Sequence, residues 1–191
     1  EYKPYPASFY HMDKLKSLTR FRDSLVRQRS RQLVDLTNVL DKVFPEFKPF
    51  FKGKFSVTAL YILANYPTPE KIANMNARSY EVLRKRSSGK FTMIQFAQLK
   101  TLAKNTVGSS DDYLLQQMEV LLDIYTQLDA KIEEVEAEII ECIIGIDPPI
   151  LSIPGIGAMS AAVILSEFGD FAKYANPSKM LSFAGLEPGY F

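Results

Sequence analysis

Residues 114–142 read LLQQMEVLLDIYTQLDAKIEEVEAEIIEC, and this stretch decides the fold. Its apolar positions alternate steps of four and three residues, at Leu114, Met118, Leu121, Tyr125, Leu128, Ile132, Val135, Ile139 and Cys142. Such steps place side chains along one stripe of a helix, as in the a and d positions of a coiled coil. Residues 109–111 supply candidate N-caps and Gly145 a candidate C-terminal stop. The pattern therefore predicts one long helix from about Asp111 to Ile144.

A second long helix is predicted from about His11 to Phe44. This segment contains neither Gly nor Pro, its apolar residues recur every three or four positions, and Pro45 follows it. It carries eight Lys and Arg against four acidic residues, whereas residues 111–144 carry ten acidic residues against one Lys. The two helices match in length, at roughly 50 Å each. We therefore expect antiparallel coiled-coil arms, paired within one chain or across a dimer.

The remaining segments divide the chain further. Residues 1–10 are predicted to be an extended lead-in, because prolines there disfavour helix at the preceding residues. Residues 11–145 form the coiled-coil module, with a small helical insert at about 45–110 in which Ser56 and Thr68 are helix-start signals. Residues 146–191 are rich in Gly, Pro, Ala and Ser and should form a separate compact unit. No period-two strand pattern stands out, so the predicted fold class is all-α.

Composition limits the classes of function. The 191 residues carry a formal charge of only +1, so any nucleic-acid signal must be local. One cysteine and one histidine make neither an internal disulfide nor a structural zinc site of four protein ligands. No stretch is apolar for the roughly 18 residues of a membrane helix, so we expect no membrane partner and a cytoplasmic protein. His11 has no catalytic partner at a recognisable spacing, and we expect no catalytic residue and no metal site.

The most specific local signal is Ile153-Pro154-Gly155-Ile156-Gly157-Ala158, which resembles the helix-hairpin-helix DNA-binding motif. Two glycines allow a sharp turn and close approach of a ligand, and the amides that begin the next helix face an anion. We predict that Pro154, Gly155, Ile156, Gly157 and Ala158 contact a DNA phosphate, with Lys173 and Lys179 nearby. Ala161 and Ala162 are small enough for close helix packing, and Ile153, Ile156, Val163 and Ile164 would form the small core of the motif. The alternative is a tight turn between two helices.

Basic residues supply two further candidates. Arg20, Arg22, Arg27, Arg29 and Arg31 form a cluster in which the first, third and fifth share a helix face, so that a phosphate backbone could lie along them. The alternative is that these arginines pair with the acidic arm or are solvated. A second cluster of basic residues comprises Arg84-Lys85-Arg86 with Lys90, beside the turn at Ser87-Ser88-Gly89. Here a solvated loop is the favoured interpretation.

Several segments together resemble the insertion-sequence transposases that share ancestry with pilin-gene invertases. They are Arg20 to Leu40, the heptad helix, Ser152 to Gly157, Glu167-Phe168-Gly169-Asp170 and Ala184-Gly185-Leu186-Glu187-Pro188. The resemblance implies a parent in which a resolvase-like domain with four acidic metal ligands precedes the coiled coil and a catalytic serine follows the C-terminal segment. It implies a divalent metal such as Mg²⁺ for that parent, DNA and a structured guide RNA as partners, and a homodimer or higher oligomer. We expect this chain to be a fragment that lacks both catalytic ends.

Two other classes of protein compete with this interpretation. A helix-hairpin-helix DNA glycosylase carries a similar turn, but Met159 stands where a catalytic lysine is common there, and one cysteine cannot hold an iron–sulfur cluster through four thiolates. A structural coiled-coil adaptor would use the C-terminal glycines only as a turn. The favoured hypothesis is a non-catalytic transposase module that binds the nucleic-acid backbone and assembles the dimer.

Overall fold

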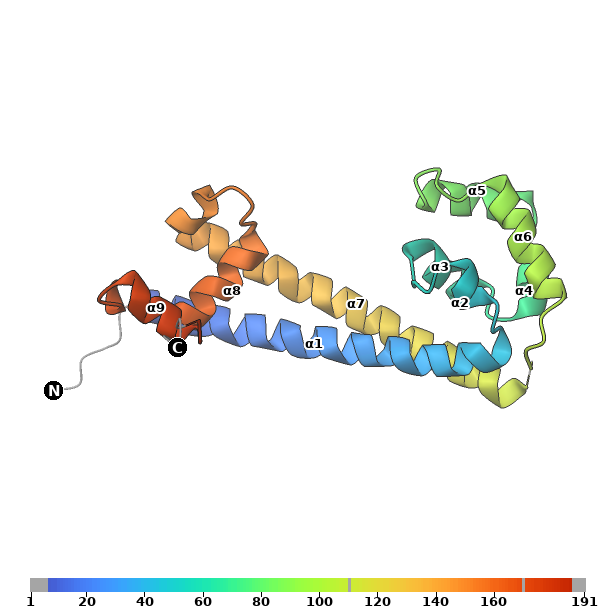
Figure 1. The fold of residues 1–191 in the computed structure, drawn as a ribbon, viewed down its shortest axis with the longest axis horizontal. Coiled ribbons are helices and arrows are strands. Elements are labelled where there is room, and N and C mark those ends of the chain that lie inside the picture. The colour runs from blue at the N-terminus through green and yellow to red at the C-terminus, as the bar shows by residue number, and fades with distance from the viewer. Residues whose placement is uncertain (1–6, 110, 170, 187–191) are drawn as a thin grey trace, which may run out of the picture. The chain divides into compact units, whose positions relative to one another are not determined.

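The computed structural model describes residues 7–109, 111–169 and 171–186, and every regular element within them is a helix (Figure 1). This confirms the predicted all-α class. The α-helices are α1 (Ala7–Val43), α2 (Phe47–Phe50), α3 (Val57–Asn65), α4 (Pro69–Ala73), α5 (Ala77–Arg86), α6 (Met93–Lys104), α7 (Asp112–Ile146), α8 (Ala158–Phe168) and α9 (Pro177–Phe183). Two short 3₁₀ helices, η1 (Pro149–Ser152) and η2 (Phe171–Lys173), flank α8.

The first helix starts earlier than predicted. Instead of beginning near His11, α1 begins at Ala7, so residues 7–10 are helical rather than extended. Pro6 restricts only the residue before it, so nothing in the sequence prevents a helix from starting directly after this proline. The rest of the predicted lead-in, residues 1–6, lies outside the described residues.

The chain forms two compact units, and each long helix contributes to both. Unit 1 comprises the residues up to Val26 and those from Lys131 onward, and unit 2 comprises Arg27–Ala130. Within unit 1, Arg22 on α1 pairs with Glu136 on α7, and its Nε donates to Oε1 over 2.8 Å. Within unit 2, Arg29 pairs with Asp129, and the Ser109 amide donates to the Lys42 carbonyl. The long helices therefore pack together within one chain, antiparallel in unit 2, as one of the two predicted alternatives requires.

The buried stripe of α7 drifts from the strict heptad pattern at both ends. Leu114, Met118, Ile132, Val135 and Ile139 are buried as predicted, but Leu122 and Ile143 take the buried places expected for Leu121 and Cys142. A straight helix has 3.6 residues per turn rather than 3.5, so its inward face moves by about 20° per heptad. Leu121 is instead half-buried against the edge of the core, and Cys142 is also half-buried.

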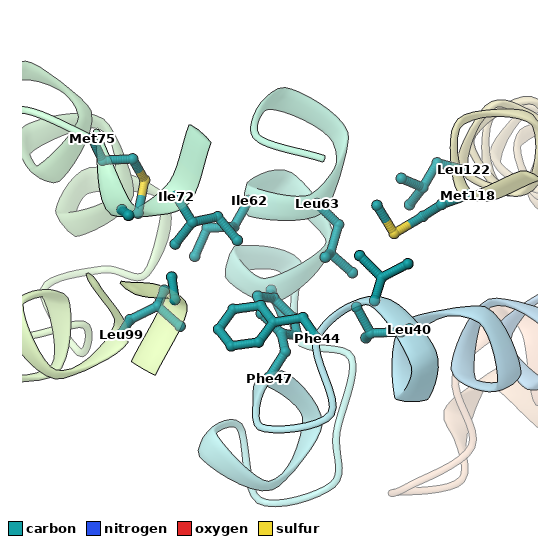
Figure 2. Packing of buried hydrophobic residues seen from close by; sticks show 14 of the residues in the cluster. Leu40, Phe44, Phe47, Ile62, Leu63, Ile72, Met75, Leu99, Met118 and Leu122 are labelled. Carbon is teal, nitrogen blue, oxygen red and sulfur yellow. The ribbon is translucent and has the colours of Figure 1, made fainter. Parts of the chain in front are cut away.

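The insert forms the main hydrophobic core of unit 2. Phe44, directly after α1, is almost fully buried, as are Phe47 on α2, Ile62 on α3, Ile72 on α4 and Leu99 on α6. These side chains converge, and Met118 on α7 lies at the edge of the same cluster (Figure 2). Ser56 caps α3 and Thr68 caps α4, with Pro at the first turn of α4, as their sequences predicted. The insert is thus a packed helical structure that joins the ends of the two long helices.

Candidate nucleic-acid interface

The Pro154-Gly155 segment forms a tight, hydrogen-bonded turn. The amide of Ile156 donates to the carbonyl of Ile153 over 3.1 Å, and Gly155 has a φ of 91°. A turn with Pro at its second position and a positive φ at its third is a type II turn, and only glycine adopts that third position without strain. The proline and the first glycine are therefore explained by the backbone of the turn itself.

The turn leads directly into the N-terminus of α8. Gly157 is the N-cap residue, with extended backbone (φ −80°, ψ 169°) and no side-chain cap, and the Ala161 amide donates to the Gly157 carbonyl over 3.0 Å. The amides of the first helical turn have no intrahelical acceptor. Such a terminus favours negative charge, because the helix dipole and the unpaired N–H groups point the same way. The arrangement can hold an anion.

Gly157 differs from Gly155 because no internal constraint explains it. Its φ lies in a region open to any residue, and a Cβ built on it would meet nothing within 4 Å. Ile153, Pro154 and Gly155 around it are exposed. A glycine that neither backbone geometry nor packing requires leaves room for an external group to approach the α8 amides closely.

The element before the turn is shorter than a helix-hairpin-helix motif would lead one to expect. The first element, η1, is a 3₁₀ helix of four residues, and Pro148 and Pro149 limit its start. The predicted apolar core also differs, since Ile153 is 50% and Val163 47% exposed, while Ala161 and Ala162 are completely buried. The small face of α8 is turned inward, and the same helix contacts α1 through Ser166 and Glu167.

Contacts between α8 and α1 fix the position of the turn. Thr19 and Ser166 are both buried, and the Thr19 hydroxyl donates to Ser166 Oγ over 3.0 Å. One residue further on, the Arg20 guanidinium makes two hydrogen bonds to the Glu167 carboxylate, at 2.9 and 3.0 Å. These bonds hold the pKa of Glu167 below its ordinary value, with a smaller contribution from nearby Lys16.

The arginine cluster does not form a single open surface. Arg22 and Arg29 point to acids of α7, and Arg20 points to α8. Arg27 is also engaged in an interaction, while Arg31 is exposed. Pairing with the acidic arm, which was one alternative interpretation of this cluster, is therefore what the structure shows for Arg22 and Arg29, whereas Arg20 pairs with an acid outside that arm. Nucleic-acid binding by the cluster stays a prediction.

The lysines near the turn are exposed, and the turn region itself is uncharged. Lys173 ends η2, and Lys179 lies in α9, where its amide is bonded to the N-cap side chain of Asn176. Residues 148–166 contain no Asp, Glu, Lys or Arg. Anion binding here would therefore rest on amides and on the helix dipole, with lysine charge supplied from outside that stretch. The side chain of His11 lies outside the described residues.

Residues 147–191, which include the turn, α8 and α9, match the transposase family IS116/IS110/IS902. This match supports an insertion-sequence transposase and a role in transposition, and it implies DNA as a partner. The matched segment is about a quarter of the chain and contains the turn at residues 153–158 with Lys173 and Lys179, but not the arginine cluster of α1. No curated protein and no solved structure matches the chain. Among the described helices, none is long and apolar enough to cross a membrane.

Proposed function

We propose that this chain is the part of an insertion-sequence transposase that holds nucleic acid by its phosphate backbone, through the turn at residues 153–158, and that it assembles as a dimer. The observation that carries the first half is Gly157. It opens an uncapped helix N-terminus to the outside, and neither φ nor packing requires a glycine there. Contacts of this kind position a duplex without selecting its sequence.

The turn and the lysines contribute in different ways. Backbone amides bind a phosphate without adding a cation, so they raise affinity at every salt concentration. Lys173 or Lys179 would displace a counterion from each phosphate that it neutralises, which changes the dependence of affinity on salt by about 0.9 in log–log slope per contact with duplex DNA. The two contributions can therefore be separated by measuring affinity over a salt series.

The test compares two glycines. Gly157→Val places a branched side chain in front of the α8 amides, whereas Gly145→Val adds the same atoms at a helical position where a Cβ also meets nothing within 4 Å. We expect Gly157→Val to weaken binding of a labelled duplex at least about tenfold with an unchanged salt slope, since one good contact is worth about 1–3 kcal/mol. Gly145→Val should bind as the parent does.

Both variants should keep the helical circular dichroism signal and unfolding midpoint of the parent. If Gly157→Val keeps its duplex affinity in a folded protein, the turn is only a connection and the adaptor hypothesis replaces the proposal. If it loses affinity only for structured RNA, the same amides serve an RNA backbone. Excision of a damaged base by the purified protein would instead favour the glycosylase alternative.

The dimer half of the proposal rests on an exposed groove in unit 2. The groove lies between α1 and α7, has a volume of about 550 Å³ and is lined by Val39, Val120 and Leu121 with polar neighbours. Tyr113, Val120 and Ile124 continue this apolar face along α7, and all are more than a third exposed. Burying such a face against a second copy removes apolar surface from water.

We expect the mass of the parent protein in solution to be that of a dimer and the mass of Val120→Lys to be that of a monomer. A monomeric parent would contradict the dimer half of the proposal.

A further inference from the structure

The charge of the chain is strongly segregated, and the positive part is the insert. Residues 45–108 contain eleven Lys and Arg, three Glu and no Asp, which is a formal charge of +8. The chain as a whole has +1, so the other residues together carry −7. A near-neutral total therefore conceals a basic module of the kind that attracts polyanions.

The cations of the insert are available at the surface. Nine of the eleven are exposed, and only Lys48 and Lys100 are half-buried. None of the ion pairs in the described part of the chain involves any of the eleven. Unlike Arg20, Arg22 and Arg29 of α1, which pair with acids on α7 and α8, these side chains carry charge that no ion pair compensates.

The densest group of these cations lies on the last turn of α5, at Arg84, Lys85 and Arg86, and on the hydrogen-bonded turn that follows it, at Lys90. The Gly89 amide donates to the Arg84 carbonyl over 2.8 Å, and the Ser88 amide donates to the Lys85 carbonyl over 3.1 Å. This pair of bonds, with Ser88 at a φ of 52°, is the Schellman pattern that closes a helix C-terminus. The turn is further tied by the Ser87 hydroxyl, which donates to the Arg84 carbonyl and accepts from the Phe91 amide.

This internal closure weakens the purely structural explanation of the basic residues. Cations in a last helical turn can bond the final carbonyls, but here backbone amides and Ser87 already bond those of Arg84 and Lys85. The remaining gain from the helix dipole is about 0.3–1 kcal/mol for an exposed cation. It also falls off beyond the last turn, so it does not explain Lys90.

Arg86 is pre-organised in the same turn. Its guanidinium lies over the ring of Tyr61 on α3, 4.1 Å from the ring centroid. Stacking uses the faces of the guanidinium and leaves the N–H donors in its plane, which are the ones that bond a phosphate in pairs. An aromatic support of this kind reduces the rotamer entropy that an arginine loses on binding.

From these observations we infer that the basic turn, defined as Arg84, Lys85, Arg86 and Lys90, is a second nucleic-acid-binding surface that contacts phosphodiester backbone. The inference does not depend on the turn at residues 153–158, since the two lie in different compact units and involve different chemistry. The basic turn binds through cations, and its contribution is therefore sensitive to salt. Nucleic acid is the polyanion that the family match makes relevant.

The experiment uses the whole chain and a charge-matched control. The test variant is Arg84→Gln/Lys85→Gln/Lys90→Gln, which leaves Arg86 on Tyr61. The control is Lys14→Gln/Lys104→Gln/Lys131→Gln, which removes three exposed lysines outside the basic turn and outside the groove between α1 and α7. Binding of labelled duplex DNA and of an RNA stem-loop is measured over a salt series. The test variant should lose about 0.9 in slope for each duplex phosphate contact, and about tenfold or more in affinity at low salt.

A second measurement locates the nucleic acid directly. Lysine acetylation followed by mass spectrometry should show Lys85 and Lys90 protected by the bound oligonucleotide and Lys14 and Lys131 unprotected. Loss of binding on DNA, on RNA or on both supports the inference and identifies the source of the backbone. The inference would be overturned if test and control variants showed the same salt dependence of affinity and Lys85 and Lys90 were not protected. Binding to anionic lipid vesicles is measured as well, and the inference would also be overturned if the test variant lost binding to the vesicles but kept binding to DNA and RNA.

The two proposals fail independently. If only the basic turn binds nucleic acid, Gly157→Val keeps the affinity of the parent, while the affinity of the triple variant depends less steeply on salt concentration. If only the turn at 153–158 matters, Gly157→Val loses affinity while the triple variant keeps its slope and its lysines stay reactive.

Discussion

At the scale of the residue, three glycines differ in what their backbone and surroundings require. Gly155 is required by a positive φ, Gly157 is left with open space around it, and Gly108 is required by packing. A Cβ on Gly108 would lie 2.0 Å from the Val43 carbonyl oxygen at the end of α1. The sequence shows three glycines, and only their surroundings separate the two that the structure requires from Gly157, which has open space around it.

Replacing Gly108 should therefore destabilise the protein, because the atom it would meet belongs to backbone that cannot move aside cheaply. Gly108 lies in a connection held to the start of the insert by Glu46, whose carboxylate accepts from the Thr106 hydroxyl over 2.7 Å and from the Val107 amide over 3.2 Å. We expect Gly108→Ala to lower the free energy of unfolding by about 1–3 kcal/mol, as overpacking does. Urea unfolding measures this change.

Gly145→Ala serves as the matched control for that measurement. It lies in α7 with nothing near its Cβ direction, and alanine is the better helix former by up to about 1 kcal/mol. It should be neutral or slightly stabilising. An equal loss of stability in both variants would mean that the close contact at Gly108 does not control the fold.

At the scale of the element, α8 is positioned by the small residues of its buried face. Ala162 is completely buried, and it lies one turn before Ser166, which bonds Thr19 on α1. The two polar side chains meet only because the helix can approach closely. This contact, together with the pairing of Arg20 with Glu167, sets the position of the turn that precedes α8.

Enlarging that face should move the helix. Ala162→Leu adds three carbons where there is no exposed space, and we expect it to cost about 1–3 kcal/mol of stability through overpacking. Val163→Leu, at a position that is 47% exposed, is the control and should change stability by less than about 0.5 kcal/mol. Thermal unfolding of both variants tests this. A stable Ala162→Leu with intact duplex binding would show that close packing of α8 is not needed for the site.

At the scale of the whole molecule, burial is concentrated in the insert and is low at the C-terminal end of the described chain. The core of unit 2 contains many nearly inaccessible side chains, among them Leu40, Phe44 and Leu99, whereas α9 buries none and leaves Phe183 61% exposed. Hydrogen exchange follows local stability, which falls where few apolar contacts are buried. Exchange rates should therefore differ between the two regions.

We expect amides of α9 to exchange fastest among the helices and amides around the core of unit 2 to exchange slowest, as measured by hydrogen–deuterium exchange with mass spectrometry. Dilution of the protein distinguishes folding from association. If α9 is protected at high concentration and loses protection on dilution, a second copy covers it. Protection of α9 equal to that of the core at every concentration would contradict the prediction.

The amino-acid sequence by itself determined what depends on local physics. Periodic apolar residues produced α1 and α7, capping residues placed the starts of α3 and α4, and Pro154-Gly155 specified its turn. The sequence also contains the +8 charge of the insert, which the +1 charge of the whole chain conceals. These features are properties of neighbouring residues and survive without knowledge of the fold.

Only the tertiary structure decided which partners distant residues meet. It paired Arg22 with Glu136 and Arg29 with Asp129. It also left Ile153 and Val163 exposed and moved the buried seam of α7 to Leu122 and Ile143. Such choices depend on how helices pack across more than a hundred residues of sequence, where periodicity gives a face but not the element that covers it. The same packing leaves Gly157 and the four cations of the basic turn exposed, and none of these cations has an ion-pair partner within the described residues.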